Sequence, residues 1–579
     1  MNRNVESHFA QLPHAEIERS VLDMSHGVKT SFNAGRLIPF DWIEVLPGDT
    51  WKITSSKVIR AQTMLTPIYD NLYLDTYWFF VPSRLVWDHF EEFMGANKTS
   101  AWIPSVEYQI PTIVPPENGF SLNTIADYMG YPVFIEWNAN DPLAPSVLPI
   151  RCYAKVCQDW FLAETVSDPL NLPTGDTNQT GSNGDSYIND VANGGMPFKV
   201  ARYHDYFSSC LPSPLRANEN VGFDFVPTVN INTDPFPVGV TKYSHSGYIT
   251  APEEGKYIGM AINGFHDYDP RKFQINSSPV YAPTGTVLAN DTTTHEITGF
   301  SSDDRRPINL WTNLPDDAIS LSGSGSFTIN ELRLAFQLQK FYEKAARAGS
   351  GRYIEIIAAH FNVTSPDARL QRSEYLGGNR IPISIHEVTN TAQGEADFLG
   401  DLGAKVASSD VHQDVEWSST EHGYIIGVMA VRYDNTYPQG MKKALMRRKF
   451  SDFYWPVFAN IGEQPVYDAE IYADADTIHN ASVFGYQEAY ADYRFSVSTC
   501  TSEMRPGVPN TLASWHLADY YTEKPTLSDD WMRVSESNVD RTLAVTSEVA
   551  NQFFADIWLE KIATRPMPVY SVPGLIDHH

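Results

Sequence analysis

The chain has 579 residues, several times the usual size of one domain, so it contains either several domains or one domain with very long insertions. Hydrophobic residues make up 42% and aromatic residues 13% of the sequence, which excludes a disordered composition. The 42 Lys and Arg against 70 Asp and Glu leave a formal net charge of −28, which argues against a protein whose whole surface binds a polyanion. Any contact with nucleic acid must therefore be local or made through another protein.

Four cysteines, Cys152, Cys157, Cys210 and Cys500, form no CxxC pair and no metal-binding spacing with histidine. We interpret them as free thiols of a protein kept in a reducing compartment. The N-terminus lacks the apolar core of a signal peptide, and no run approaches the roughly 20 apolar residues that cross a bilayer. We therefore expect the chain to be made and kept in the cytosol unless another factor releases it.

The first predicted elements are a polar arm and three strands. Residues 1–35 are mixed and polar, with a weak helical pattern around 17–24, and we interpret them as an arm that could reach a neighbouring molecule. The strands are predicted over 37–45, 51–61 and 71–81. The third strand is apolar on both faces of the extended chain, which indicates that both faces are covered, and Pro82 ends it. Three successive strands joined by turns predict the start of an antiparallel sandwich.

Helices and long loops follow these strands. A helix is predicted over 83–95, where a serine suits the N-cap and a glycine suits the left-handed residue at the end. Recurrent prolines over 97–147 indicate an extended surface excursion. A second helix is predicted over 149–167, and 173–197 is predicted to be a long Gly/Asn/Asp loop.

The composition changes over residues 219–304. Thr, Asn, Gly, Pro and Tyr dominate there, and eleven acidic residues stand against four basic ones. This composition predicts an exposed, β-leaning insertion. A helix over 328–348 and a strand over 353–363 are predicted after it, and further strands are predicted over 405–408, 424–433 and 494–497. Strands scattered between long excursions favour a mainly β fold in which 36–579 is a single elaborated sandwich.

None of the catalytic or cofactor-binding motifs that we sought is complete in the sequence. The His386-Glu387 pair opens like a zinc-protease helix, but Asn390 stands where the second histidine is needed. Four carboxylates lie close together at Asp468, Glu470, Asp474 and Asp476, but the segment lacks the glycine and the terminal glutamate of a calcium-binding loop. We therefore interpret these carboxylates as a solvated acidic face. We expect no enzyme activity, no metal and no cofactor.

Two kinds of function remain open on these grounds. An acidic, aromatic-rich sandwich suits a glycan-binding or glycoside-hydrolysing protein, but sequence cannot pair carboxylates across a cleft. The other is the structural protein of a self-assembling shell, for which a long arm, long insertions and incomplete catalytic motifs are all natural.

Five segments point to one family by their order and spacing. They are RLIPFDWIEVLPGDTW at 36–51, LRLAFQLQKFYEKAARAGSGRYIE at 332–355, HFNVTSPDARLQRSEYLGG at 360–378, FSDFYWP at 450–456 and FGYQEAYADYR at 484–494. Nearly end to end, the chain resembles the major capsid proteins of the gokushovirus branch of the Microviridae, the small single-stranded DNA phages. The resemblance implies an eight-stranded antiparallel jelly roll with large outer insertions. It also implies a T=1 icosahedral shell of sixty copies around circular single-stranded DNA.

The resemblance also implies partners and a location. The partners are an internal scaffolding protein, a DNA pilot protein, a small basic DNA-binding protein and the single-stranded DNA genome, and the location is the virion, assembled in the cytoplasm of a bacterial host. The small basic protein fits the net charge of −28.

The insertion over 219–304 is expected to protrude near the three-fold axes and to touch a receptor on the host surface. Its aromatic side chains that could contact a sugar or a protein are Tyr243, Tyr248, Tyr257 and Phe265. The alternative is a solvated decoration that binds no receptor.

The densest basic patch is Lys442, Lys443, Arg447, Arg448 and Lys449. An acidic protein can hold DNA only where cations concentrate and carboxylates are absent, so we expect this patch to line the shell and contact the packaged DNA. If 441–450 is a short helix, Lys443 and Arg447 lie one turn apart, and a phosphate between them would offset their repulsion. The alternative is that the patch pairs with acidic residues of a neighbouring subunit.

Overall fold

The structure is a computed structural model. It describes residues 18–96, 107–213 apart from 140 and 143, 357–362 apart from 359, 371–389, 391, and 402–570 apart from 460. Between 228 and 347 it describes the strands and the helix named below by their backbone, with side chains only at 334–342 and 344. The chain divides into two compact units, one of Met1–Arg216 with Lys340–His579 and one of Ala217–Gln339.

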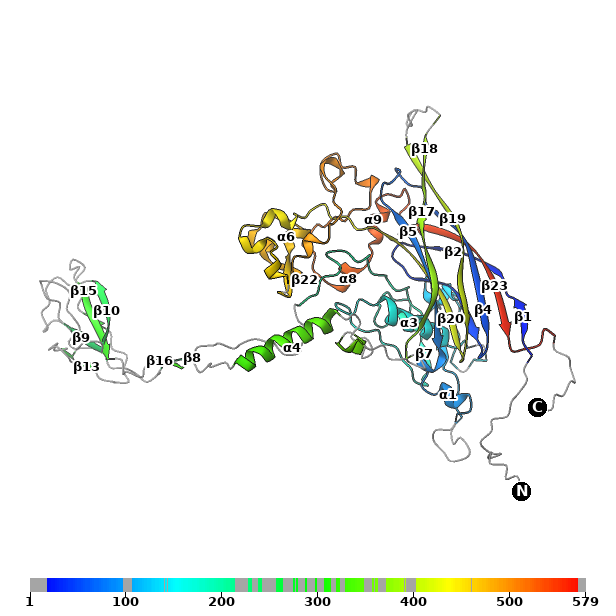
Figure 1. Cartoon of the computed structure of the whole chain (residues 1–579), viewed down its shortest axis with the longest axis horizontal. Helices are drawn as coiled ribbons and strands as arrows, with labels where there is room; N and C mark the ends of the chain where they lie inside the picture. The colour runs from blue at the N-terminus through cyan, green and yellow to red at the C-terminus, as the bar shows by residue number, and fades with distance from the viewer. Residues whose placement is uncertain are drawn as a thin grey trace, which may run out of the picture. The chain divides into compact units, whose positions relative to one another are not determined.

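Two antiparallel sheets form the sandwich of the first unit (Figure 1). The larger sheet has the order β1-β23-β4-β19-β18, with β2 also paired to β23, and the smaller has the order β17-β5-β20-β3. Their bounds are β1 Ser20–Asp23, β2 His26–Phe32, β3 Ile38–Val45, β4 Thr50–Ala61, β5 Leu72–Pro82, β17 Glu374–Ile383, β18 Ile385–Thr389, β19 Leu402–Ser418, β20 Gly423–Tyr433 and β23 Phe553–Arg565. From β2 to β5, successive strands fall alternately in the two sheets, which is the winding of a jelly roll.

The mainly β, antiparallel sandwich is therefore confirmed. The strands predicted over 37–45, 51–61, 71–81 and 424–433 are present within a residue or two, and 405–408 lies near the start of the longer β19. Among the described residues the two sheets hold six and four strands, and eight of these remain when β1, which adds to β23, and β18, which forms a hairpin with β19, are set aside. The helix indicated by the weak pattern around 17–24 does not form, since Ser20–Asp23 is β1, and its pairing with β23 overrides a weak local preference.

The core lies between the sheets and continues beyond the smaller one. On β4, alternate side chains point inward, and Trp51, Ile53 and Ile59 are buried. On β5 both faces are covered, as predicted, because Tyr77 and Phe79 pack against Phe161 on the outer side, with ring centroids 5.4 and 5.9 Å apart. The four cysteines are free, as expected, and Cys152, Cys157 and Cys210 are buried.

The segment between β5 and β17 begins with short elements in the first unit. They are η2 Ser83–Leu85, α1 Phe90–Phe93, β6 Ile113–Val114, α2 Ile125–Tyr128, α3 Leu148–Val156, the π-helical turn η3 Cys157–Phe161, β7 Gln179–Thr180 and η4 Val191–Asn193. The prediction of one continuous helix over 83–95 is wrong, because the helical structure is interrupted between η2 and α1. There Trp87 Nε1 donates to Asp176 at 2.7 Å, and the Asp88 N–H donates to the Thr174 carbonyl instead of continuing a helix. The helix predicted over 149–167 ends at Phe161. The strand predicted over 353–363 is wrong where it is described, because 357–358 and 360–361 are helical.

The described strands of the second unit form three small antiparallel sheets, which agree with the predicted β-leaning insertion. Their orders are β10-β15-β9-β13, β12-β11-β14 and β16-β8. The strands are β8 Thr228–Ile231, β9 Val238–Thr241, β10 Tyr257–Asn263, β11 Gln274–Ile275, β12 Ser278–Pro279, β13 Val287–Leu288, β14 Ile297–Thr298, β15 Pro307–Asn313 and β16 Ile319–Ser322. The predicted helix over 328–348 is α4 Ile329–Arg347, which carries the chain from this unit into the first.

The segment between β20 and β23 is the other long insertion of the sandwich. Its elements are η6 Lys443–Met446, η7 Phe450–Asp452, η8 Pro456–Phe458, β21 Glu463–Tyr467, α6 Asp468–Ile471, α7 Thr477–Ala481, β22 Val483–Glu488, η9 Ala491–Tyr493, η10 Ser502–Met504, η11 Ala513–Trp515, α8 Asp529–Met532 and α9 Glu536–Asp540. We call residues 441–493 the β21–β22 lobe. A small core of its own, with Phe207, Ile471 and Phe484, supports the lobe. The strand predicted over 494–497 is wrong, because the N–H groups of Arg494 and Phe495 turn back to the Ala491 carbonyl.

Candidate functional site

The predicted basic patch lies in the β21–β22 lobe, but it is not a helix. Only Lys443–Met446 form a short 3-10 turn, η6, and the chain leaves it extended at Arg447, with φ −67° and ψ 129°. The helix considered over 441–450 is therefore wrong, and the stacking of Lys443 on Arg447 that depends on it is not supported. Each of these two side chains instead binds a partner inside the lobe.

Lys443 is held against α6. Its Nζ donates to the Pro465 carbonyl at 2.9 Å and lies 3.7 Å from Glu470 Oε1. Glu470 is buried, and it also accepts hydrogen bonds from the Tyr206 hydroxyl and the Tyr467 N–H. Burial raises the pKa of the Glu470 carboxyl above its ordinary value, against the opposing effect of Lys443.

Arg447 is held against η9. Its guanidinium pairs with Asp492, donates through Nε to the Asp452 carbonyl at 3.1 Å, and lies 4.2 Å from the ring centroid of Tyr493. The premise that carboxylates are absent near the basic patch is therefore wrong for Lys443 and Arg447. Their charges are balanced by this chain itself.

The other three basic side chains, Lys442, Arg448 and Lys449, are exposed. The backbone N–H groups of Arg448 and Lys449 each donate to Asp452 Oδ2 at 2.8 Å, which holds the pKa of that carboxyl below its ordinary value. The structure therefore divides the predicted site into two structural cations and three surface cations.

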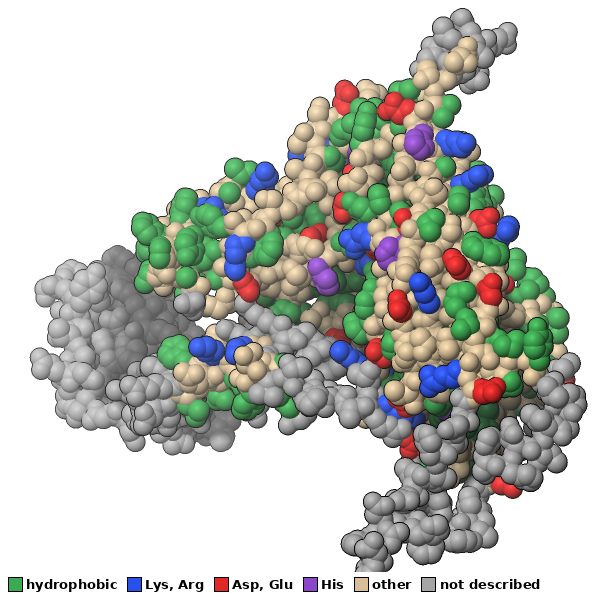
Figure 2. Space-filling view, turned by 45° about the vertical axis from the view of Figure 1, so that its right-hand side comes forward, with side chains coloured by type: hydrophobic (Ala, Val, Ile, Leu, Met, Phe, Trp, Pro, Cys, Tyr) green, Lys and Arg blue, Asp and Glu red, His purple; other side chains and the backbone are tan. Residues whose placement is uncertain are grey.

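The same segment presents apolar side chains that sequence reasoning did not identify as a site. The exposed ones are Leu445, Phe450, Phe453, Tyr454, Trp455 and Val457. Figure 2 shows hydrophobic side chains gathered on this lobe, with Lys or Arg side chains beside them. The run FSDFYWPVF at 450–458 was the available signal, but aromatic residues in a sequence more often indicate a core than a surface.

The four carboxylates near α6 do not form one solvated face. Asp468 and Glu470 are buried, and Asp468 pairs with Lys524, so the interpretation is wrong for both. Asp474 is exposed, and Asp476 is the exposed N-cap of α7, where it accepts from the Ile478 N–H at 2.8 Å. Across the described residues, no group of three or more His, Cys, Asp or Glu side chains is arranged to hold a metal ion.

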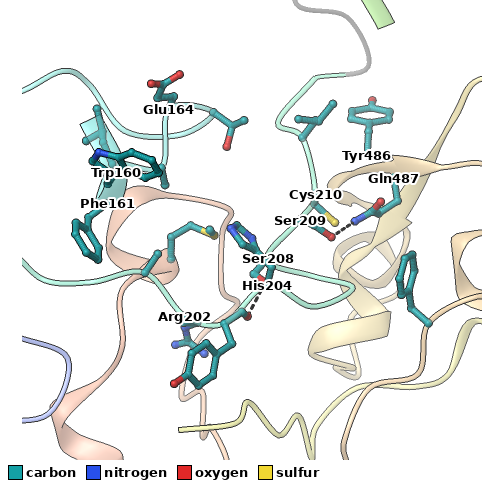
Figure 3. Close-up of a pocket in the computed structure, with 18 of the residues that line it drawn as sticks. Trp160, Phe161, Glu164, Arg202, His204, Ser208, Ser209, Cys210, Tyr486 and Gln487 are labelled. Carbon is teal, nitrogen blue, oxygen red and sulfur yellow. Dashed lines mark hydrogen bonds between the residues drawn. The ribbon is translucent and has the colours of Figure 1, made fainter. Parts of the chain in front are cut away.

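A cavity of about 800 Å³ lies between the two long insertions (Figure 3). Trp160, Phe161 and Glu164 lie across it from Tyr486 and Gln487 of β22. The wall between them is held by hydrogen bonds, such as that from Gln487 Nε2 to Ser209 Oγ at 2.6 Å.

The arginines that line this cavity are engaged within the protein. Arg380 Nε and Arg432 Nε donate to the two oxygens of buried Asp75, at 2.8 and 2.7 Å, and both guanidinium groups lie over the Tyr203 ring. Arg202 pairs with buried Asp519. These charges fasten the insertions to the smaller sheet and to each other.

The residues predicted for host contact lie in the second unit. Tyr257 begins β10. Tyr243, Tyr248 and Phe265 lie outside the described residues. Their role stays a prediction. In the described part of the chain, no helix is both long and apolar enough to cross a bilayer.

The sandwich, with its alternating strands and long insertions, is a jelly roll, a fold that virus capsid proteins share with lectins, and comparison with known proteins decides between these classes. A family model described as "Capsid protein (F protein)" matches residues 10–575. The chain is 35% identical to capsid protein VP1 of Chlamydia phage 1 over 602 residues, covering 99% of this chain and 98% of the relative. It is 34% identical to capsid protein VP1 of Spiroplasma virus 4, covering 98% and 97%. It is 32% identical to that of Bdellovibrio phage phiMH2K, covering 99% and 98%.

The chain belongs to the F-protein capsid family of bacteriophages. The resemblance to the major capsid proteins of the Microviridae is therefore confirmed, and the chain is a structural major capsid protein.

Proposed function

We propose that sixty copies of this capsid protein form a T=1 icosahedral shell around a circular single-stranded DNA genome, and that the chain catalyses no reaction. The family match over residues 10–575 carries the proposal, since it spans the whole sandwich and both long insertions. The full chain, produced together with its scaffolding partner, is expected to yield closed isometric particles by electron microscopy. Monomers that persist and hydrolyse a glycan would overturn the proposal and favour the glycosidase alternative.

The proposed partners follow from the same function. An internal scaffolding protein would guide assembly in the cytoplasm of the bacterial host, and a DNA pilot protein would accompany the genome in the virion. A small basic DNA-binding protein would balance the genome, because this chain carries a net charge of −28 and itself repels a polyanion. Mass spectrometry of purified particles tests these partners, and a genome packaged without any basic protein would contradict the last of them.

We also propose that residues 219–304 contact the host surface. The second unit, Ala217–Gln339, is compact in itself and contains small sheets of its own, which suits a segment that can serve a separate role. Replacing 219–304 with a short linker should leave particles intact and abolish attachment to host cells. Attachment that survives would make the insertion a solvated decoration, and loss of particles would make it a subunit interface.

A further inference from the structure

We infer that the exposed apolar and basic face of residues 441–458 is an interface that binds a second copy of this chain. The inference rests on the proposed assembly of a shell and names one surface through which that assembly occurs. We call this surface the 441–458 face.

The exposure of its apolar side chains is the first observation. Leu445, Phe450 and Val457 are 74%, 73% and 81% exposed, within a run of thirteen residues. Phe453, Tyr454 and Trp455 in the same run are about half exposed. Single exposed apolar residues are normal on a protein surface, but this many in one short segment indicates a surface that another molecule covers.

The second observation is that internal contacts hold the segment in place. Trp455 Nε1 donates to the Phe450 carbonyl at 3.1 Å, and the Tyr490 hydroxyl donates to the Ser451 carbonyl at 3.0 Å. Arg447 and Lys443 anchor the start of the segment through Asp492 and Glu470, as described above. A surface fixed before binding loses little conformational entropy on association, so its apolar area contributes more fully to affinity.

The charges of the chain and of the 441–458 face indicate which molecule binds there. Two chains that each carry −28 repel one another overall, so contact is favoured where one chain presents cations to the acidic surface of the other. Lys442, Arg448 and Lys449 are exposed beside the apolar side chains and supply those cations. Aromatic side chains and Arg, both present on this face, are enriched at interfaces between proteins.

Single-stranded DNA is the competing occupant, and it fits the face less well. Nucleobases stack on aromatic rings, but Leu445 and Val457, two of the three most exposed apolar side chains of this face, have no ring. The Asp452 carboxylate also lies against the backbone of Arg448 and Lys449, where it would repel a phosphate.

The test removes exposed apolar side chains of the 441–458 face and leaves the anchoring residues Lys443 and Arg447 unchanged. Phe450→Ser together with Val457→Ser should raise the chain concentration needed for assembly at least about tenfold, because burying each side chain contributes more free energy than a tenfold change in an equilibrium constant requires. Assembly is followed by sedimentation and electron microscopy on the full chain with its scaffolding partner, and thermal unfolding of the unassembled chain should match the wild type.

The matched control is Val411→Ser together with Val549→Ser, which removes side chains that are 70% and 80% exposed elsewhere on the first unit. The control pair should assemble like the wild type. Equal loss of assembly in both pairs, or normal assembly of the Phe450 and Val457 pair, would overturn the interface. A wild-type chain that never assembles would overturn the proposed shell and the interface together.

A charge variant separates the two occupants. Changing Lys442, Arg448 and Lys449 to Gln should weaken assembly, and the loss should diminish as salt screens the repulsion between chains. Particles that assemble normally but retain less genome would overturn the interface in favour of DNA.

Discussion

Lys57 of β4 and Asp414 of β19 form an ion pair inside the sandwich, with Nζ 3.7 Å from Oδ1 and both side chains almost fully buried. Lys57 Nζ also donates to Thr76 Oγ1 of β5 at 3.0 Å, and Trp78 Nε1 of β5 donates to Asp414 Oδ2 at 3.3 Å. Burial lowers the pKa of the Lys57 ammonium, although Asp414 opposes the effect. The pair therefore joins the two sheets through one polar network in an otherwise apolar core.

Lys57→Met should lower the free energy of unfolding by about 3–5 kcal/mol, because it removes the buried ammonium beside the Asp414 carboxylate and leaves the partly exposed His412 imidazole, 3.0 Å from Asp414 Oδ1, as its remaining basic neighbour. Adding Asp414→Asn to the same chain should recover part of the loss, since the uncompensated charge is then gone. Urea denaturation of the unassembled chain measures both. A single variant within about 1 kcal/mol of the wild type would show that the network adds little to stability.

The stability of the larger sheet should depend on pH through His26 of β2. His26 Nε2 lies 3.5 Å from Asp41 Oδ1, and the hydrogen bond to Asp41 raises the pKa of His26 above 6.5, against burial and the nearby Lys561. The folded chain thus binds this proton more tightly than the unfolded chain. The resulting stability is fully present below pH 6.5 and is lost as the pH rises through the raised folded value.

His26→Gln should therefore destabilise the chain at pH 6 and have less effect at pH 8.5. The difference should stay under about 1 kcal/mol, because the imidazole is partly exposed to solvent. Thermal unfolding at the two pH values measures it. An equal effect at both values would show that the proton on His26 makes no contribution.

The paired and the exposed basic residues of the β21–β22 lobe should differ in how much they contribute to the free energy of unfolding. Arg447→Gln removes one partner of a largely buried ion pair with Asp492 and should cost about 3 kcal/mol. Changing Lys442, Arg448 and Lys449 to Gln should alter the stability of the unassembled chain by only about 0.5 kcal/mol, because the three side chains are exposed. Chemical denaturation compares the two variants, and similar losses in both would contradict the division.

Gly440→Ala should destabilise the lobe by about 1–3 kcal/mol. A Cβ at this position would overlap the Glu470 carbonyl oxygen, so α6 would have to move away from the start of the 441–458 face. Gly175→Ala is the matched control, because a Cβ there meets no atom within 4 Å. Thermal unfolding of both variants measures the effect, and equal melting temperatures would show that the close approach is not required.

Sequence predicted the sandwich where a strand carries its own signal. The stretch 71–81 is apolar on both faces and ends at a proline, and these local features survive as β5. Prediction failed where a distant partner decides the local structure. Trp87 turns toward Asp176 and divides the expected helix, and β1 exists only because β23 lies beside it.

The same limit applies to the site. The five basic residues were recognised as a cluster because they are close in sequence. The partners that neutralise two of them, Glu470 and Asp492, lie 27 and 45 residues away along the chain, so spacing could not reveal them. Exposure of Phe450 and Val457 was equally hidden, since an aromatic run predicts burial unless the fold leaves it uncovered.

The position of β23 has a consequence for synthesis. This strand, Phe553–Arg565, pairs with β4 from the start of the chain, and β19, the other neighbour of β4, also comes from the later half. While the ribosome is making the first long insertion, between β5 and β17, β4 therefore has two open edges that could pair with another nascent chain, and one edge stays open until β23 is made. A chain cut short before residue 553 could not close its larger sheet, so premature termination would yield aggregation-prone fragments in place of defective subunits that enter the shell.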